Sequence, residues 1–489
     1  MTNGVLERIP ALESVRDLLE QRGVEAYIVG GYVRDVLIGR HSADVDIALQ
    51  GDALALAREV AQRLGGKYVL LDEANHVARV AFPPEESVLC LDFSGYAGSI
   101  ESDLSRRDFT VDAMAVKLNQ WQDKVCASLV VDPFGGLSDL DTRLIRAVQA
   151  NVFQDDPARL LRALRLAGEL EFKVHPETEA FIRRDAALVS SVPGERVHEE
   201  LVRIFAFHNG SRIIAYMNEL GLLLAVFPEL VPARGFEQKG VHFWDVLHHC
   251  LNTVAAVEHL LRQGHWEVVE PDVLSSVPWT EGLQAHFASP VGKMSARATL
   301  LKVAALLHDV AKPQTKTVEP DGRWHFLGHA PIGASVVRQA LERLRFSNRE
   351  VDLVETEVYH HLRPAQMTQE DLPTRRAVYR YFRDTEGAGV DVFFLALADY
   401  LATHGPRSDM DEWRRQTRLM GYVFEERRRQ MAVVAPAKLI DGHDMMRFFR
   451  LEPGPRVGEL LGMVREAQAA GEVGTREDAL DLVRRHISG

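Results

Sequence analysis

The sequence predicts an α+β protein in which a mixed α/β head comes first and mainly helical parts follow. Short apolar runs of strand type alternate with helical patterns up to about residue 93. From about residue 150, apolar side chains recur at helical spacing in one segment after another. With 489 residues, the chain has the length of about three domains.

Each predicted element rests on its own local pattern. Amphipathic spacing predicts helices over 11–22 and 52–64, and later over 157–171, 176–189, 194–208 and 210–219. Runs rich in β-branched and aromatic residues predict strands over 26–29, 45–49, 67–71, 77–82 and 89–93. Residues 240–410 are again helical and rich in histidine, with a long loop or insertion expected over 263–296.

These patterns divide the chain into four parts. They are a head (1–150), a helical neck (151–232), a histidine-rich domain (233–410) and a helical tail (411–489). The stretch 227–235, which contains proline and glycine, marks the end of the neck. Residues 453–458 contain a glycine turn before a predicted helix, whose N-terminus could bind a phosphate, although an ordinary turn would look the same.

Composition and net charge indicate the cellular compartment and limit the possible binding partners. The apolar runs are too short to cross a bilayer and the first ten residues lack a signal-peptide core, so we expect a cytoplasmic protein without a membrane partner. The scattered cysteines Cys90, Cys126 and Cys250 argue against a disulfide framework. Because the net charge is −13, any contact with a nucleic acid must come from locally concentrated arginines.

The run GGYVRD at 30–35, followed by ADVDI at 43–47, predicts a phosphate and metal site. The glycine pair allows a tight turn after a short strand, and the following helix points backbone N–H groups at the same place. On the next strand Asp44 and Asp46 share one face, because side chains alternate. Paired carboxylates beside a phosphate cradle suit Mg²⁺. The alternative is a plain glycine turn with two surface aspartates.

Two later motifs carry charges suited to a nucleotide. Arg107 and Asp108, in RRDFT at 106–110, offer a cation for phosphate oxygens and a carboxylate for sugar hydroxyls, or else form a surface ion-pair cluster. In the predicted helix after Pro157, Asp156 is the expected N-cap, and it lies three residues before Arg159. A carboxylate beside a guanidinium matches the pairing edges of cytosine and adenine, but not those of uracil and guanine.

Taken in order, these motifs resemble the class II tRNA nucleotidyltransferase and bacterial poly(A) polymerase family over residues 24–210. The blocks are GGYVRD with DVD, RRDFT, DPFGG at 132–136, DDPAR at 155–159 and ERV at 195–197. The resemblance implies a polymerase-β-like nucleotidyltransferase head. It also implies two Mg²⁺ ions that activate the primer 3′-hydroxyl and stabilise the leaving pyrophosphate.

The resemblance assigns roles to individual residues. Asp44 and Asp46 would be catalytic metal ligands, and Asp92 is a possible third carboxylate or a plain strand-end aspartate. The family usually has asparagine at the position of Asp112, so a contact from there is in doubt. The implied nucleotide-binding residues are Gly30, Gly31, Arg34, Arg107, Asp108, Asp156 and Arg159, with Arg162 and Arg165 extending the basic stripe.

A short connection favours cytidine addition over adenosine addition. Family members that build the whole CCA end usually carry a longer flexible loop before the RRDFT motif, whereas this chain has only residues 93–105 there. We therefore expect CC addition to tRNA 3′ ends from CTP. Full CCA addition or poly(A) polymerisation, with ATP as substrate, stays open.

The histidine-rich part resembles the HD phosphohydrolase superfamily, because imidazoles and carboxylates recur in the order His, His-Asp, His, His, Asp. The resemblance implies His249, His308, Asp309 and Asp399 as ligands of a first metal, with His329 and His361 for a second. Ni²⁺, Mn²⁺ or another divalent ion could serve in a phosphatase or 2′,3′-cyclic phosphodiesterase that repairs RNA ends. Alternatives are a degenerate helical scaffold, or an HD phosphohydrolase whose head only binds nucleotide or RNA.

Overall fold

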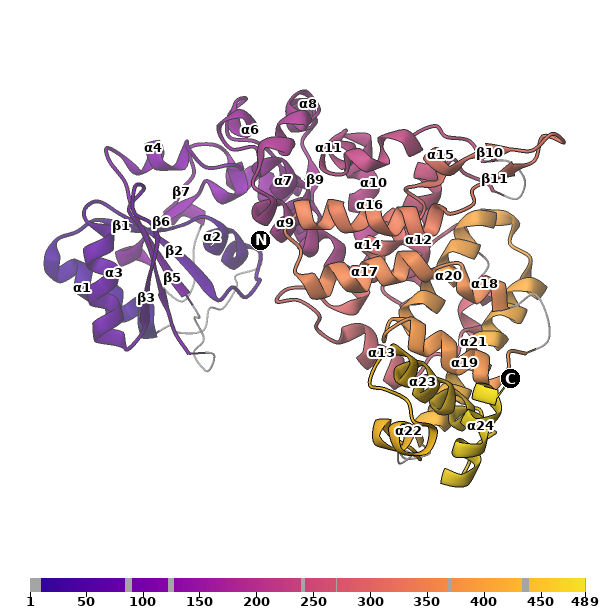
Figure 1. Cartoon of the computed structure of the whole chain (residues 1–489). Helices are drawn as coiled ribbons and strands as arrows, with labels where there is room; N and C mark the ends of the chain where they lie inside the picture. Colours follow the sequence, from indigo (N-terminus) through magenta and orange to yellow (C-terminus); the bar gives the residue numbers. More distant parts are fainter. Residues whose placement is uncertain are drawn as a thin grey trace. The chain divides into compact units, whose positions relative to one another are not determined.

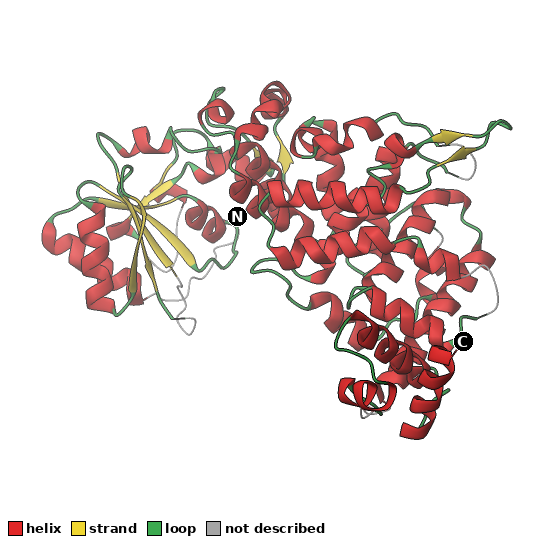
Figure 2. Cartoon of the chain, viewed as in Figure 1, coloured by secondary structure: helices red, strands yellow, loops and turns green. Residues whose placement is uncertain are grey.

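The computed structural model describes residues 10–83, 90–121, 127–238, 242–269, 271–367, 372–432 and 439–488. The chain forms two compact units, one of Met1–Val192 with Met217–Val226 and one of Pro193–Tyr216 with Phe227–Gly489. Figure 1 labels the elements, and Figure 2 shows most of the strands in the first unit and a mainly helical second unit with the short β10–β11 hairpin. The predicted α+β class, an α/β head followed by helices, is confirmed.

A seven-stranded sheet forms the centre of the first unit. Its order is β3 (Lys67–Asp72), β4 (Val77–Ala81), β5 (Cys90–Gly95), β2 (Asp44–Leu49), β1 (Ala26–Val29), β6 (Ala115–Lys117) and β7 (Val130–Val131). Strand β2 pairs in parallel with β5, and the other neighbouring pairs are antiparallel. All four residues of β1 are buried, as expected of an apolar strand in the middle of a sheet.

Helices α1 (Pro10–Arg22) and α3 (Ala53–Leu64) agree with the predicted spans. Asp52 caps α3 by accepting a hydrogen bond from the Ala55 backbone N–H at 2.9 Å, and the helix ends at Gly65 in the left-handed conformation. Its apolar face packs on β3, β4 and β5 (Figure 1). The short β6, β7 and α4 (Ile100–Leu104) were not predicted, because elements of two to five residues lack a readable period.

Further short elements complete the first unit. Helix α7 begins at Arg159 rather than at Pro157, so the prediction that Asp156 is its N-cap was wrong. Pro157 and Ala158 form a turn, within which Asp156 accepts a hydrogen bond from the Ala158 N–H at 3.2 Å. The other elements are α2 (Gly31–Leu37), α5 (Gly136–Thr142), β8 (Leu144–Ile145), α6 (Val152–Asp155), α7 (Arg159–Leu170), β9 (Lys173–Val174), α8 (Pro176–Asp185) and α11 (Leu222–Val226).

The second unit is built around a helix that is buried on every side. Residues 298–307 of α14 (Arg297–Leu307) are all buried, which suits a helix that is apolar nearly all round. Four helices pack around it or on one another: α12 (Val246–Leu260), α16 (His329–Arg343), α17 (Asn348–His360) and α20 (Gly389–His404). These helices carry the predicted histidine-rich cluster.

Residues 263–296, expected to be a long loop or an insertion, are not a loop throughout, because they contain α13 (Glu281–Ala288), which is capped by the Thr280 hydroxyl. The tail helices α22 (Gly442–Phe449), α23 (Pro455–Ala469) and α24 (Arg476–Ser488) enclose a small apolar core of their own. The remaining elements after residue 193 are α9 (Gly194–Ala206), α10 (Gly210–Glu219), α15 (Lys312–Thr315), β10 (Thr317–Val318), β11 (Trp324–His325), α18 (Arg363–Met367), α19 (Arg375–Asp384) and α21 (Met410–Ala432).

Among the helices of the described residues, none is both long enough and apolar enough to cross a membrane.

The central strand should dominate the stability of the sheet. Ile28 on β1 is fully buried, so Ile28→Ala should lower the free energy of opening of the sheet by about 2–5 kcal/mol. Hydrogen exchange of the β1 and β2 amides measures this free energy. Leu71→Ala on β3 is the control, because Leu71 is 48% exposed and its loss should change little. Equal effects of the two substitutions would contradict this account of the core.

Candidate functional site

Three carboxylates lie on two neighbouring central strands of the head sheet: Asp44, Asp46 and Asp92. Asp46 lies opposite Asp92 on the parallel neighbour β5 and opposite Val29 on β1. Along β2, Asp44 is exposed, Val45 is buried and Asp46 is partly exposed, which matches the predicted alternation. The pair Asp44 and Asp46 therefore faces the same side of a rigid strand, where two oxygen donors could hold a divalent cation.

Asp92 is already engaged by a guanidinium. Arg79 on β4 donates two parallel hydrogen bonds to the two Asp92 oxygens, each 2.7 Å long. Such a bidentate pair is among the stronger side-chain interactions. To act as a third metal ligand, Asp92 would have to give up one of these bonds.

Gly30 stands between β1 and α2, where no other residue fits. Its φ of +74° lies in the left-handed region that glycine tolerates. A Cβ atom there would also lie 2.5 Å from Arg107 Nη1 and 3.0 Å from Asp46 Oδ2. The glycine turn thus brings a cation and a carboxylate close to the backbone, and α2 begins at Gly31 directly after it.

Arg34 does not lie at the surface of this cradle. Its side chain is buried, and its guanidinium donates to Asp112 Oδ1 at 2.5 Å and to Asp35 Oδ1 at 2.9 Å. Burial raises the pKa of Asp112, while Arg34 acts in the opposite direction. Asp112 is therefore held by Arg34, an ion pair that the sequence did not predict. Its signal was a lone carboxylate in an otherwise apolar run, FTVDAMAV at 109–116.

The other predicted arginines divide between the site and the helix. Arg162 Nε contacts the buried Asp108 carboxylate at 2.8 Å, and its Nη2 lies 4.0 Å from Asp112. Arg165, expected to extend the basic stripe, is instead buried and paired with Glu169 one turn along α7 at 2.5 Å. The predicted basic stripe therefore does not reach the surface at Arg165, because this position of α7 faces the core.

A cavity of about 320 Å³ lies beside these charges. It is lined by Ser105, Arg106, Arg107, Gln149, Val152, Asp155 and Arg159. Arg159 Nη2 donates to the Arg106 carbonyl at 2.8 Å, and its Nε lies 3.9 Å from Asp156 Oδ2. The structure thus brings Arg107 and Arg159 to one cavity, with Asp156 next to Arg159 but outside the lining.

Electrostatics favour a cation at Asp46. Burial raises the pKa of this carboxyl to about 6, although the nearby Arg107 guanidinium acts in the opposite direction. The neighbouring Asp92 adds to the increase, since two carboxylates repel each other. A bound divalent cation would relieve this unfavourable charge, so the donor set fits Mg²⁺.

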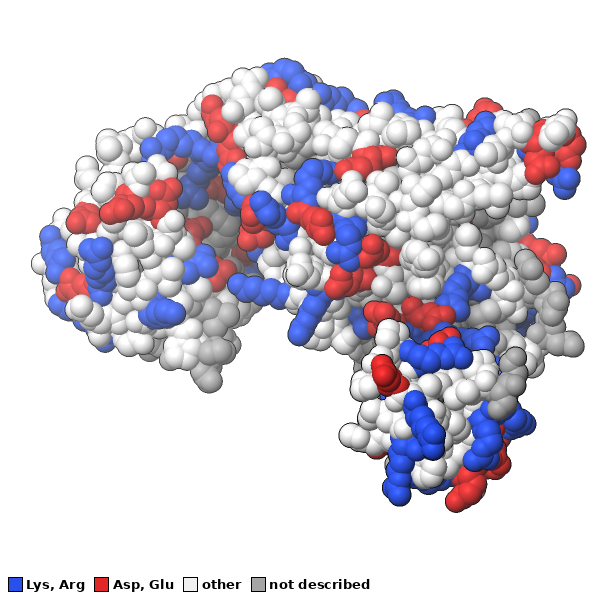
Figure 3. Space-filling model, viewed as in Figure 1, with Lys and Arg blue, Asp and Glu red and all other residues white. Residues whose placement is uncertain are grey.

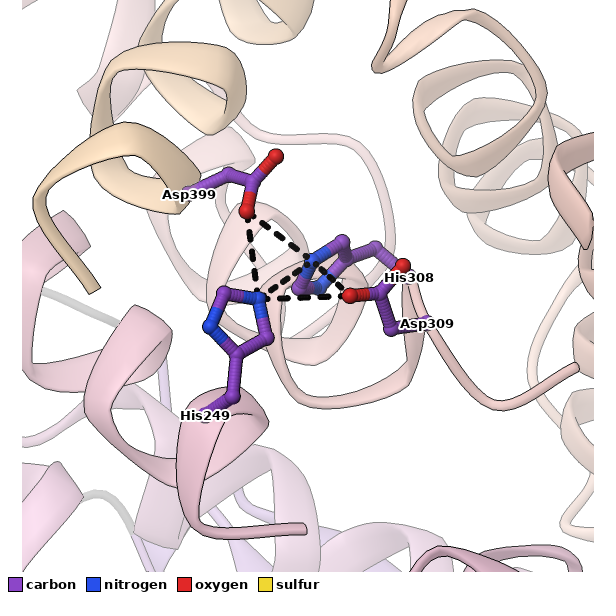
Figure 4. A group of neighbouring side chains, drawn as sticks. All are labelled: His249, His308, Asp309 and Asp399. Carbon is purple, nitrogen blue, oxygen red and sulfur yellow. Dashed lines mark hydrogen bonds and ion pairs between the residues drawn. The ribbon is translucent and has the colours of Figure 1, made fainter. Parts of the chain in front are cut away.

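In the second unit, four predicted residues converge on one point (Figure 4). His249 Nε2 lies 3.3 Å from Asp309 Oδ2 and 3.1 Å from Asp399 Oδ1. His308 Nε2 lies 3.2 Å from the same Asp309 oxygen and 3.2 Å from His249 Nε2. Two imidazoles and two carboxylates with their donor atoms this close form a possible site for a divalent transition metal.

A second group shares Asp309. His329 Nε2 lies 3.4 Å from Asp309 Oδ1 and 3.3 Å from His361 Nε2. The Nδ1 atoms of His329 and His361 lie 2.7 Å and 2.6 Å from the carbonyls of Phe326 and Val358. A carbonyl only accepts, so each Nδ1 carries the proton and each Nε2 offers a lone pair, as metal-binding histidines require.

The titration of these histidines shows where positive charge is favoured. Although burial opposes it, Asp309 and Asp399 raise the pKa of His308 to about 10. Burial lowers the pKa of His361 to about 4, and the charge of His308 adds to this effect. The carboxylates of the first group therefore favour positive charge at His308.

Comparisons with known proteins show which families the parts of this chain resemble. Residues 26–146 match the family model of the poly A polymerase head domain, 171–234 match the probable RNA and SrmB-binding site of polymerase A, and 246–404 match the HD domain. An A-adding tRNA nucleotidyltransferase of Deinococcus radiodurans is 35% identical over 94% of this chain and 95% of its own length. A CC-adding tRNA nucleotidyltransferase of Thermus thermophilus is 33% identical over 93% and 92%.

Solved structures share the fold over nearly the whole chain. A CCA-adding enzyme in complex with ATP has a TM-score of 0.63 at 19% identity and covers 98% of this chain and 93% of its own. A Thermotoga maritima CCA-adding enzyme complexed with tRNA has a TM-score of 0.60 at 19% identity, with coverage of 97% and 94%.

The raised pKa of Asp46 predicts that ionisation of this carboxyl lowers the free energy of unfolding as the pH rises. The folded-state pKa of about 6 exceeds the ordinary value of 3.8, so the stability contributed by the protonated form is present below pH 4 and lost as the pH rises through 6. Asp46→Asn stays neutral. In chelator at pH 8 it should therefore raise the free energy of unfolding by about 1–3 kcal/mol, and the gain should vanish by pH 4.

Urea unfolding curves at pH 4, 6 and 8 measure this difference. The matched control is Asp44→Asn, whose exposed carboxylate should change the free energy by less than about 0.5 kcal/mol. A gain for Asp46→Asn that is the same at pH 4 and pH 8 would rule out its origin in the Asp46 charge.

Proposed function

This chain belongs to the tRNA nucleotidyltransferase/poly(A) polymerase family, and from that premise we propose that it adds cytidine residues to tRNA 3′ ends. The reaction uses CTP, needs no template and releases pyrophosphate, and it builds the CC of the CCA end. The observation that carries the choice of cytidine is the short connection after β5. Only residues 96–99 separate β5 from α4, which ends at Leu104, one residue before the arginine motif.

The nucleotide site combines the paired aspartates with the glycine turn. Asp44 and Asp46 would hold Mg²⁺, which when bound supplies Lewis-acid activation of the primer hydroxyl and stabilises the leaving pyrophosphate. Gly30 and Gly31 leave room for the triphosphate beside Arg107, whose Nη1 flanks Gly30. Arg34 stabilises this turn through its hydrogen bond to Asp112.

Base selection is assigned to α7 and the turn before it. Asp156 would accept a hydrogen bond from the exocyclic amine of cytosine or adenine, and Arg159 would donate to the neighbouring ring nitrogen. Uracil and guanine would leave both groups unpaired, which is a strong basis for rejection in a desolvated site. Asp108, held by Arg162, is positioned for a contact to the ribose or a phosphate.

Addition of adenosine is the second candidate, because the Deinococcus radiodurans relative is an A-adding enzyme at 35% identity. It would place the chain at the last step of CCA synthesis, or in complete CCA addition. Since cytosine and adenine present the same amine and ring acceptor to Asp156 and Arg159, these two residues alone do not separate the two nucleotides.

A tRNA extension assay separates the candidates. With tRNA lacking its three terminal nucleotides, CTP should give two additions, and ATP should give none either alone or after CC. Efficient incorporation of adenosine after CC would overturn the restriction to cytidine. Asp46→Ala should lower CMP incorporation to background, whereas Asp141→Ala, an exposed carboxylate on α5, should match wild type.

For the second unit we propose a phosphohydrolase acting on phosphorylated RNA ends, with 2′,3′-cyclic phosphates as the leading substrate. His249, His308, Asp309 and Asp399 would hold one divalent ion, Ni²⁺ or Mn²⁺ being suited to this donor set, with His329 and His361 for a second. When bound, such an ion supplies a hydroxide nucleophile at neutral pH. Attack of water that breaks the P–O3′ bond of the cyclic phosphate, or that breaks P–O2′ and is followed by hydrolysis of the resulting 3′-phosphate, would free the 3′-hydroxyl that the first unit extends.

Hydrolysis of 2′,3′-cyclic AMP with Ni²⁺, Mn²⁺ or Mg²⁺ tests this activity. His308→Ala should lose turnover, because it removes a ligand at the centre of the first group. Asp46→Ala should keep it, since the two sites lie in different units. His265→Ala, an exposed histidine outside the groups, is the control. Turnover that survives in His308→Ala would remove the proposed site.

We also propose a four-part division into head (1–150), neck (151–232), HD domain (233–410) and tail (411–489), with the tail binding RNA. Basic side chains gather over the tail helices in Figure 3. The exposed arginines of these helices and the turns beside them are Arg447, Arg450, Arg456, Arg465, Arg476, Arg484 and Arg485. Such a local concentration could contact RNA phosphates despite the net charge of −13. The cytoplasm is the proposed compartment.

A further inference from the structure

Aromatic and lysine side chains gather next to the metal centre of the second unit, and nothing in the proposed chemistry so far uses them. The aromatic–lysine cluster consists of Phe236, Trp324, Phe326, Lys312 and Lys316. Phe236 precedes α12, Lys312 begins α15, and the other three lie on or beside the β10–β11 hairpin. All but Lys312 are half-buried, so the cluster is open to solvent on one side.

The cluster is joined directly to the metal-binding residues. Lys312 Nζ lies 2.6 Å from Asp309 Oδ2 and donates to Gln238 Oε1 at 2.9 Å. The same ammonium lies 5.8 Å from the centre of the Phe326 ring. The Phe326 carbonyl accepts the Nδ1–H of His329. Phosphate chemistry at Asp309 would therefore take place within one side-chain length of an aromatic face.

The rings and the second lysine extend this surface away from the metal. Phe236 and Phe326 meet edge to face with centroids 6.3 Å apart. Lys316 Nζ lies 5.2 Å from the Phe236 centroid and 3.0 Å from that of Trp324. Packing alone does not need cations on three aromatic rings at the mouth of a charged centre, whereas recognition of nucleic acid combines these two side-chain types.

Polar groups at the same place are short of partners. The amide nitrogen of Gln238 and Nδ1 of His242 are buried, and neither finds a hydrogen-bond partner among the described residues. Lys312 has three N–H donors and uses two of them on Asp309 and Gln238. A ligand rich in oxygen acceptors would satisfy these donors, and a phosphoester on a ribose is such a ligand.

We propose that the aromatic–lysine cluster recognises the terminal nucleotide of an RNA end. The base packs against Phe236 and Phe326, and the phosphoester meets Lys312 beside the metal centre. This inference rests on the proposed phosphohydrolase function and adds to it a site that recognises the base of the substrate. It requires no residue of the first unit.

Binding of three small ligands tests the proposal. Isothermal titration is run on the full chain, both freed of metal with chelator and loaded with Ni²⁺. Adenosine 3′-phosphate carries base and phosphate, ribose 5-phosphate lacks the base, and adenosine lacks the phosphate. In wild type, adenosine 3′-phosphate should bind at least about fivefold more tightly than either partial ligand, since stacking of a base is worth 1 kcal/mol or more.

Conservative variants test whether Phe236 and Phe326 cause the preference for a ligand that carries a base. Phe236→Leu and Phe326→Leu keep the apolar volume and remove the ring, so the preference for adenosine 3′-phosphate over ribose 5-phosphate should fall to less than about twofold. Phe181→Leu is the matched control, because Phe181 is also half-buried with a guanidinium, that of Arg184, 5.1 Å from its ring centre, but it lies on α8 of the first unit. Circular dichroism checks that each variant is folded.

The outcomes separate this inference from the function on which it rests. Absence of a base preference in both wild-type forms, or its survival in both Phe→Leu variants, overturns the aromatic–lysine cluster as a nucleotide site, even if 2′,3′-cyclic AMP is hydrolysed. Base-selective binding that the two variants lose, in a protein that hydrolyses no phosphoester, supports the cluster and removes the phosphohydrolase.

Discussion

The carboxylate site of the head and the histidine–aspartate site of the second unit both depend on the compensation of buried charge. A carboxylate taken out of water is strongly destabilising unless a cation stands next to it. In the head, Arg34 and Arg162 compensate Asp112 and Asp108, and Arg79 compensates Asp92. Asp46 is left with the least favourable balance, and burial raises its pKa to about 6. The proposed divalent-cation site at Asp46 therefore lies where these charged groups have an excess of negative charge.

In the second unit, packed helices hold the buried carboxylates next to the imidazoles that compensate their charge. The donor groups come from α12, α20, the ends of α14 and α17, and the first residue of α16, which pack on one another around the buried α14. Because packed helices resist small displacements, the imidazole nitrogens of His249 and His308 are held 3.2 Å apart. Two lone pairs at that distance repel each other, so a proton or a metal ion between them stabilises the arrangement.

Much of this could be read from the sequence, because the signals were local. A glycine turn between an apolar strand and a helix, Asp44 and Asp46 two residues apart, and His-Asp at the end of an apolar helix each define their own geometry. Partners distant in the chain could not be read in this way. Nothing local pairs Arg34 with Asp112, 78 residues away, or turns Arg165 into the core. The start of α7 was misplaced because proline fits both the turn and the first helical position.

The proposed selection of the base depends on the same requirement that polar groups keep their partners. In this structure Arg159 donates to the Arg106 carbonyl, so meeting a base means exchanging one hydrogen bond for another. Such an exchange changes the free energy little for a base that accepts in the right place. A base that presents a donor there leaves Arg159 without an acceptor and Asp156 facing an oxygen, which costs far more than the correct pair gains. Selectivity would then come mainly from the penalty on wrong bases, and tight binding of the right one would be unnecessary.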